Sequence, residues 1–229
     1  MSVSKFFVRD NMKKAEIDSY LAGELKKAGY SKVEMTKTPL GTRLVIYAAK
    51  PGMVIGRRGQ SIRDLTQVLE QTFGMENPQV SVAAIEAPDL DPMVVASQIA
   101  SALQRGIHFR RAAYWALQRA REAGALGVEV AIRGKLTTDR ARYEKFKDGY
   151  LPSVGDAVLK QVKRAVVDIQ LKQGLFGIAV RILPPGAHFP DRPEIRIPGE
   201  RAPEPPKETA TETEEESEET EKDANTAKA

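Results

Sequence analysis

Two glycines that flank two arginines, at Gly56–Gly59, form the segment of this sequence best suited to binding a phosphodiester. Glycine lets a backbone approach a phosphate closely, and a helix that begins there directs its free N–H groups and positive dipole end at the same anion. Arg57 and Arg58 offer forked donors to phosphate oxygens, while Ile55 and Ile62 could form an apolar floor for bases. A bare GxxG spacing is mostly structural. Its place between a buried strand and an amphipathic helix nevertheless predicts a clamp for single-stranded RNA.

A second group of basic and aromatic side chains lies on a helix predicted over residues 109–123. Arg110 and Tyr114 fall on one stripe by helical spacing, and Arg111 and Trp115 fall beside it. Arginines next to aromatic rings suit phosphate contact and base stacking, so Arg110, Arg111 and Tyr114 are candidate RNA contacts. A plainer interpretation stays open: a solvated basic face with Trp115 half-buried as part of the core.

The third candidate is a polar, basic segment from Gly134 to Asp148, which we expect to be a loop. It interleaves Tyr143 and Phe146 with basic side chains, and loops of this composition commonly dock onto folded RNA through phosphates. A mobile charged loop without a ligand is the alternative. The candidate RNA contacts in this segment are Lys135, Arg140, Arg142, Lys145 and Lys147.

Residues typical of catalysis or metal binding are scarce. The chain has no cysteine and two histidines, which excludes disulfides, thiolate zinc sites and cysteine nucleophiles and fits a reducing cytoplasm. No Walker loop, GxGxxG, HExxH or GxSxG is present. Asp89 and Asp91 lie between prolines and are expected to cap a helix, and His108 is expected to be structural. We therefore expect no enzyme, no metal, no cofactor and no small-molecule substrate.

The charge of the chain is unevenly distributed. From Glu200 onward there are eleven acidic and four basic residues, so the net charge of +4 divides into about +11 before Glu200 and −7 from there on. A body with that excess repels itself unless a polyanion neutralises it, and nucleic acid is the usual partner. The longest uncharged stretch, 92–104, is too short to span a bilayer, and the N-terminus lacks an apolar signal core. We expect no membrane association.

The elements that position these residues are expected to form two α+β units. Helical spacing predicts a helix over 11–28, and alternation predicts strands near 33–36 and 80–84. The apolar run at 44–47 predicts a more buried strand, and an amphipathic helix follows the glycine loop up to Phe73. This order of helix, strand, strand, helix–loop–helix and strand is a complete small α+β unit. We place it at 1–86 and follow it with a linker at 87–92.

The second unit, at 93–185, begins with two helices and continues with a strand near 128–133. The period of 157–171 is ambiguous; we favour a strand in its second half, because Gln173-Gly174 can turn into a strand near 178–182. Residues 186–229 are rich in Pro and Glu. We expect a disordered tail there, because so few apolar residues cannot offset the entropy lost on ordering.

Several of these motifs, in this order, resemble the universal small-subunit ribosomal protein three family in its archaeal form, over about residues 1–185. The resemblance implies an N-terminal type II KH domain and a C-terminal α+β domain with two helices and a mixed sheet. The matching segments are Val54–Ile62, Phe109–Ala112, Gly124–Val130, Arg133–Leu136 and Gly174–Val180.

The resemblance also implies a function. Members of the family are structural constituents of the small-subunit head, bind its rRNA, contact neighbouring head proteins and line the mRNA entry channel, where basic side chains guide and help unwind mRNA. Arg110 and Arg111 occupy the matching positions, and Tyr114 stands where some relatives carry a further basic residue. The expected location is cytoplasmic and ribosome-bound. Two alternatives from other classes remain: a free-standing KH regulator acting through residues 1–86, and a nuclease or lyase acting on nucleic acid.

Overall fold

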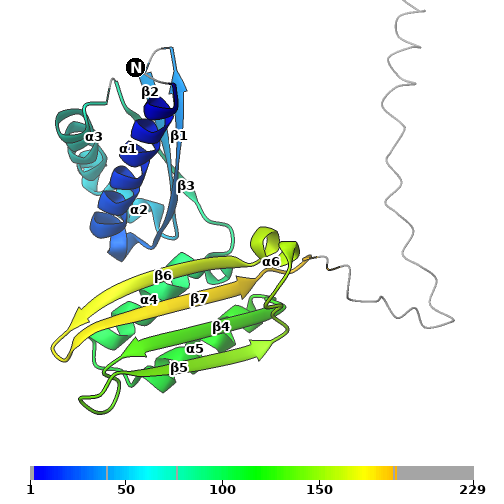
Figure 1. Ribbon diagram of the computed structural model, residues 1–229. Helices are drawn as coiled ribbons and strands as arrows, with labels where there is room; N and C mark the ends of the chain where they lie inside the picture. Colours follow the sequence, from blue (N-terminus) through cyan, green and yellow to red (C-terminus); the bar gives the residue numbers. More distant parts are fainter. Residues whose placement is uncertain (1–2, 40, 76, 188, 190–229) are drawn as a thin grey trace, which may run out of the picture. The chain divides into compact units, whose positions relative to one another are not determined.

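The computed structural model describes residues 3–39, 41–75, 77–187 and 189, which form two layered arrangements of helices on a sheet (Figure 1). Each arrangement has its own hydrophobic core. We call the cluster around Leu21, Leu44 and Leu69 the N-terminal core and the cluster around Ile99 and Ile178 the C-terminal core. The predicted α+β class is confirmed. The predicted disordered tail lies outside the described residues, apart from residues 186, 187 and 189.

The N-terminal core is built from a three-stranded sheet and the helices that contact it. The strand order is β1-β2-β3, with β1 and β2 antiparallel and β2 and β3 parallel. Leu44 and Ile46, on alternate positions of β2, pack against Ile17 and Leu21 of α1 and Leu69 of α3. The elements are α1 (Val3–Glu24), η1 (Leu25–Ala28), β1 (Tyr30–Thr38), β2 (Gly41–Ala48), α2 (Pro51–Ile55), η2 (Arg57–Gly59), α3 (Gln60–Phe73) and β3 (Gln79–Ala84).

The first helix differs from its prediction at both ends. It begins at Val3 rather than residue 11, and a 3-10 turn replaces its last residues. Its first three turns carry Phe6, Phe7 and Met12 as exposed side chains, so no buried face marks them as helical in the sequence. The predicted order of elements around the glycine loop is confirmed.

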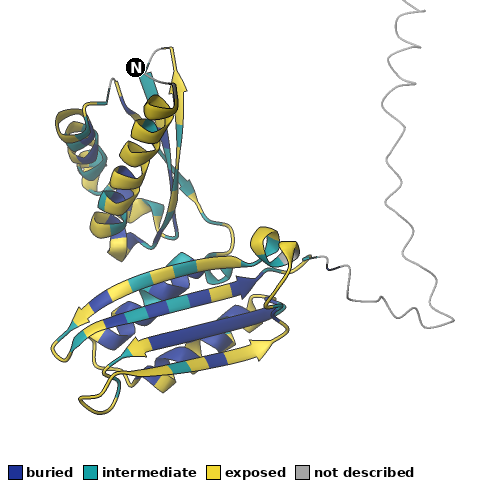
Figure 2. Ribbon diagram, viewed as in Figure 1, coloured by how far each residue is buried: buried dark blue, intermediate teal, exposed yellow. Residues whose placement is uncertain are grey.

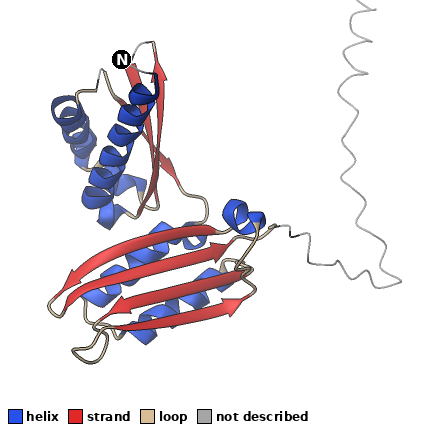
Figure 3. Ribbon diagram, in the orientation of Figure 1, coloured by secondary structure: helices blue, strands red, loops and turns tan. Residues whose placement is uncertain are grey.

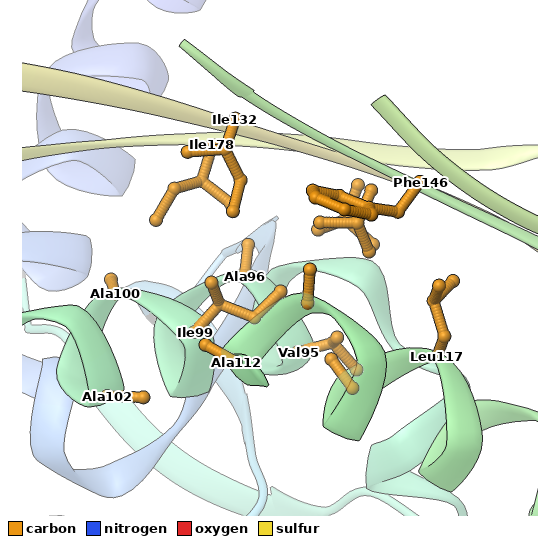
Figure 4. Packing of buried hydrophobic residues seen from close by; sticks show 14 of the residues in the cluster. Val95, Ala96, Ile99, Ala100, Ala102, Ala112, Leu117, Ile132, Phe146 and Ile178 are labelled. Carbon is orange, nitrogen blue, oxygen red and sulfur yellow. The ribbon is translucent and has the colours of Figure 1, made fainter. Parts of the chain in front are cut away.

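The C-terminal core lies between two helices and a four-stranded sheet. The strand order is β5-β4-β7-β6, and every neighbouring pair is antiparallel, so the expectation of a mixed sheet here was wrong. Figure 4 shows Ile132, Ile178 and Phe146 directed toward Ile99 and Leu117 of the two helices. The elements are η3 (Pro88–Leu90), α4 (Pro92–Gln104), α5 (Phe109–Glu122), β4 (Gly127–Gly134), β5 (Arg142–Gly149), α6 (Asp156–Gln161), β6 (Lys163–Leu171) and β7 (Gly174–Leu183).

Polar side chains fix the starts of both helices of this core. Oδ1 of Asp91 accepts a hydrogen bond of 3.0 Å from the backbone N–H of Met93, as an N-cap residue does. Nδ1 of His108 accepts one of 3.4 Å from the N–H of Arg110. The capping role predicted for Asp91 and the structural role predicted for His108 are thus confirmed.

Two segments have a secondary structure that the sequence did not fully predict. The stretch predicted as a loop, 134–148, ends in strand β5, which Figure 3 shows at one side of the sheet. Only Phe146 of this strand is buried, so its alternation was invisible among charged residues. The ambiguous segment divides into helix α6 and strand β6, and β6 turns into β7 through Lys172 and Gln173, so the favoured strand is confirmed.

Replacing Gly127 with alanine should destabilise the C-terminal core, because the added Cβ would collide with the carbonyl oxygen of Tyr150. Overpacking of this kind costs about 1–3 kcal/mol. The same change at Gly23, in α1 with nothing within 4 Å of the added Cβ, should instead stabilise by about 1 kcal/mol. Urea unfolding followed by circular dichroism measures both variants. A Gly127→Ala midpoint at or above that of the unchanged chain would contradict this packing.

Candidate nucleic-acid interface

The glycine loop has the backbone conformation that its sequence suggests. Gly56 (φ 72°, ψ −175°) and Gly59 (φ 72°, ψ 19°) both have positive φ, and Arg58 adopts the left-handed conformation at φ 52°. A Cβ on Gly56 would also collide with the hydroxyl of Ser61. Only glycine therefore fits at position 56, and the close contact with Ser61 joins the loop to the first turn of α3.

The side chains of this loop are available to bind a ligand and are not packed into the core. Arg57 and Arg58 are exposed, and neither has an ion-pair partner among the residues that the structure describes. Ile55 is 41% exposed, and Ile62 is only partly buried. The loop thus combines free guanidinium groups, apolar surface and the start of a 14-residue helix, an arrangement that can take up a phosphate.

The predicted stripe on α5 is present, but its two arginines differ. Nε and Nη2 of Arg110 each donate a hydrogen bond of 3.2 Å to Glu144 on β5. These bonds, and the charge of Glu144, raise the pKa of the Arg110 guanidinium. Arg111 is exposed and has no ion-pair partner in the described part of the chain. Arg111 is thus ready for an anion, whereas Arg110 must share or leave Glu144 to bind one.

Two aromatic side chains extend this stripe. Tyr114 is 61% exposed and meets the buried ring of Phe146 edge-on at 5.3 Å. Trp115 is 44% exposed, and the guanidinium of Arg119 lies 4.9 Å from the centre of its ring. Trp115 is not part of the C-terminal core, so its core interpretation was wrong. It lies one helical turn after Arg111, beside the binding stripe, as the helical spacing in the sequence predicted.

The five basic residues predicted on the third segment do not form one loop surface. Lys135 and Arg140 are exposed on the connection before β5, and Arg142, Lys145 and Lys147 lie on the strand itself. Side chains alternate along a strand. Lys145 and Lys147 therefore lie on the face opposite Phe146, whereas Arg142 shares the face of Phe146.

Partners within the chain hold two of these lysines. Nζ of Lys145 lies 3.0 Å from the Glu129 carboxylate, and Nζ of Lys147 donates a 3.3 Å hydrogen bond to the carbonyl of Leu151. The contacts of Arg110 with Glu144 and of Tyr114 with Phe146 join α5 to β5. The second and third candidate segments are therefore neighbours, whereas the glycine loop belongs to the other core.

A helix, two strands, a GxxG-connected helix pair and a parallel third strand, with exposed arginines in the loop, define a KH-type RNA-binding protein. Comparison with known families agrees: the KH domain family matches residues 16–89, and the family described as ribosomal protein S3, C-terminal domain, matches residues 99–182.

The chain is also similar to proteins named small ribosomal subunit protein uS3. The identity is 47% over 189 residues with that of Methanocaldococcus jannaschii, covering 82% of this chain and 91% of the relative. It is 46% over 184 residues with that of Saccharolobus solfataricus, covering 80% of each. It is 45% over 196 residues with that of Methanobrevibacter smithii, covering 86% of this chain and 78% of the relative. The chain belongs to the uS3 family of ribosomal proteins.

Family membership decides between the alternatives that the sequence left open. The relatives are named as ribosomal proteins and not as enzymes, so the nuclease or lyase alternative is not supported. A free-standing KH regulator would not need the ribosomal C-terminal domain that matches here. Among the described residues, no helix is long and apolar enough to cross a membrane.

Replacing Glu144 with glutamine should strengthen binding of single-stranded RNA, because Arg110 would lose its partner within the chain. Exposed ion pairs are weak, so we expect no more than about fivefold tighter binding at low salt. Fluorescence anisotropy with a labelled oligonucleotide measures this. Glu122→Gln is the matched control. It also removes one negative charge, but Glu122 lies on α5 and its partner is Gln118, not Arg110. Equal gains in both variants would refute a specific role for the Arg110–Glu144 pair.

Proposed function

We propose that the chain is a structural constituent of the head of the small ribosomal subunit. It binds small-subunit rRNA, contacts neighbouring head proteins and lines the mRNA entry channel, where it guides mRNA and helps to unwind it. The protein acts in the cytoplasm as part of the ribosome. The support comes from the uS3 family, whose relatives carry that name, and from the first turn of α5.

The placement of Arg110 and Arg111 is the observation that carries the mRNA part of this proposal. Both lie in the first turn of α5, which contains no acidic residue. The dipole of a helix is positive at this end, so cations are unfavourable there. Glu144 compensates Arg110 from the neighbouring strand. Arg111 has no such compensation within the described residues, and a phosphate would supply it.

The mechanism is electrostatic and positional. Phosphates that bind fixed cations release their counterions, which favours binding without regard to sequence. Arg111 and Trp115 are one helical turn apart, about 6 Å along the axis, so a phosphate and an adjacent base can be held together. Stacking of a base on an aromatic ring adds about 1–3 kcal/mol. Tyr114, in place of a basic residue, offers a second ring.

Unwinding then needs no chemical step in this chain. A strand held by α5 as it leaves a hairpin cannot pair again, so each advance of the mRNA by the translocating ribosome is retained. The protein contributes retention, and the ribosome contributes the force.

The limits of the two domains are part of the same proposal: a KH domain at 1–86, a linker at 87–92, the ribosomal domain at 93–185 and a tail at 186–229. The two separate cores support it. Within the KH domain, Arg57 and Arg58 bind phosphates of single-stranded RNA, and Ile55 and Ile62 contact its bases.

Subunits assembled with an Arg110→Gln/Arg111→Gln variant should translate hairpin-containing messages several-fold more slowly, because the strand released at the channel is no longer held. Unstructured messages should be translated at the normal rate. Lys26→Gln/Lys27→Gln is the matched control, since both lysines are exposed and lie on η1. Elongation rates in a reconstituted system provide the measurement. If subunits with this variant translate hairpin-containing messages as fast as the control, the proposed role at the mRNA entry channel is wrong.

Removing the charges of the loop, with Arg57→Gln/Arg58→Gln, should weaken binding of the free protein to single-stranded RNA. Each lost phosphate contact lowers the slope of log K against log salt by about 0.7, so we expect a reduction of about 1.4. Titrations at several salt concentrations test this against Lys26→Gln/Lys27→Gln. A slope equal to that of the control would mean that the loop does not contact phosphates.

A further inference from the structure

The four-stranded sheet carries helices on one face only among the described residues (Figures 1 and 3). Val130, Ile178 and Ile182 point to the helices as part of the C-terminal core. Side chains alternate along strands, so the residues between them lie on the opposite face, which we call the open face. The cations of the open face are Arg133, Lys145, Lys147, Arg164 and Arg181.

Positive charge is in excess on the open face. Its five cations face only two carboxylates, Glu129 and Asp168, which leaves a net charge of +3. Moreover, Arg164 of β6 and Arg181 of β7 stand directly opposite each other in the strand register. Like charges in such a pair destabilise a sheet. A bound polyanion would neutralise both guanidinium groups and remove this repulsion.

Glu129 fixes the middle of this surface. Its side chain is only 9% exposed, although it lies on the open face. One carboxylate oxygen is 3.0 Å from Nζ of Lys145, and the other is 3.7 Å from Nη1 of Arg181. Figure 2 shows that β4, which carries Glu129, is buried along nearly its whole length. One carboxylate therefore holds two cationic groups over the centre of the sheet, which reduces the entropy they would lose on binding.

The residues between the cations have small side chains. Ala131 of β4 and Ala179 and Gly177 of β7 are neighbours in the register, and none has a side chain longer than a methyl group. The cations are spread over all four strands, which are about 4.8 Å apart. A ligand that fits must therefore be extended, must approach closely and must carry several negative charges.

The composition of the open face favours nucleic acid over a protein partner. Protein interfaces have an apolar centre and are depleted of lysine. Here Lys145, Arg181 and Glu129 lie together near the middle of the sheet. Of the most exposed apolar side chains on this face, Leu175 and Tyr143 lie near strand ends, and Val166 lies on the outermost strand β6. No exposed aromatic row that would stack successive bases occurs on the described strands. Contact with phosphates, without reading of bases, is what this surface can do.

We infer that the open face of the C-terminal sheet is a second RNA-binding surface, which holds the phosphate backbone of folded small-subunit rRNA. The inference rests on the rRNA-binding function proposed above and assigns a surface to it. Arg133, Arg164 and Arg181 join Lys145 and Lys147 as phosphate contacts. Glu129 is a positioning residue, because it acts through Lys145 and Arg181.

The test is binding of the full chain to a folded fragment of small-subunit rRNA over a range of salt concentrations. Arg164→Gln/Arg181→Gln should weaken binding on the order of tenfold at low salt and lower the slope of log K against log salt by about 1.8, at about 0.9 per duplex phosphate. Lys26→Gln/Lys27→Gln removes the same charge elsewhere and should leave the slope unchanged. Urea unfolding should show that Arg164→Gln alone is at least as stable as the unchanged chain, since it removes a like-charge pair and leaves the contact of Arg181 with Glu129 in place.

Other outcomes overturn the inference. If Arg164→Gln/Arg181→Gln matches the control slope while Arg110→Gln/Arg111→Gln still slows hairpin messages, the open face is not an RNA surface and the proposed channel role stands. If the unchanged chain fails to bind the rRNA fragment at all, the rRNA-binding function itself fails. A third arm uses polyglutamate: if the variant loses binding to polyglutamate but keeps its rRNA slope, the face fits an acidic protein instead.

Discussion

The contact between Arg110 and Glu144 ties the first turn of α5 to strand β5, and the arrangement of charge in this region depends on it. Without Glu144, two adjacent guanidinium groups would stand at the positive end of a helix dipole. With it, one cation is compensated and the other remains available. The sheet repeats this balance with Glu129, which lies between Lys145 and Arg181. In both places a single carboxylate holds cations in position without neutralising all of them.

The apolar part of the structure makes such placement possible. Helices α4 and α5 bury a large share of alanine, including Ala96, Ala113 and Ala116. Small side chains let helices approach a sheet closely and leave little room for movement. The basic residues on the outside of α5 therefore stand on a rigid support. Rigid placement of charge is what a surface needs if it is to bind a polyanion without a large loss of entropy.

Much of this fold could be predicted from the sequence, because its buried elements carry regular apolar spacing. The helix with Leu65 and Leu69 and the strand with Val128, Val130 and Ile132 are examples. Strand β5 could not be found this way, since Phe146 is its one buried residue. The partners of the site residues within the chain could not be predicted from the sequence either. Glu144 is 34 residues from Arg110 in the chain, and only the strand register brings them together.

The properties of the site residues likewise divide into those that the sequence could predict and those that it could not. Exposure of Arg57, Arg58, Arg111 and Tyr114 agrees with their predicted availability. The sequence could not show that Glu129 would be nearly buried, because the atoms that cover it belong to two other strands. Burial of a charge depends on contacts across a sheet, and a pattern along one strand does not contain them.

The strand order also has a consequence for the protein before it reaches its ribosome. β5 and β6 are the outermost strands, and their free backbone groups could pair with another copy of the chain. Lys145 and Lys147 on one edge, and Lys163 and Arg164 on the other, make such pairing between copies repulsive. Three of these side chains, Lys145, Lys147 and Arg164, are ones that we assign to RNA in the assembled particle, and they would thus also protect the newly made protein from aggregation.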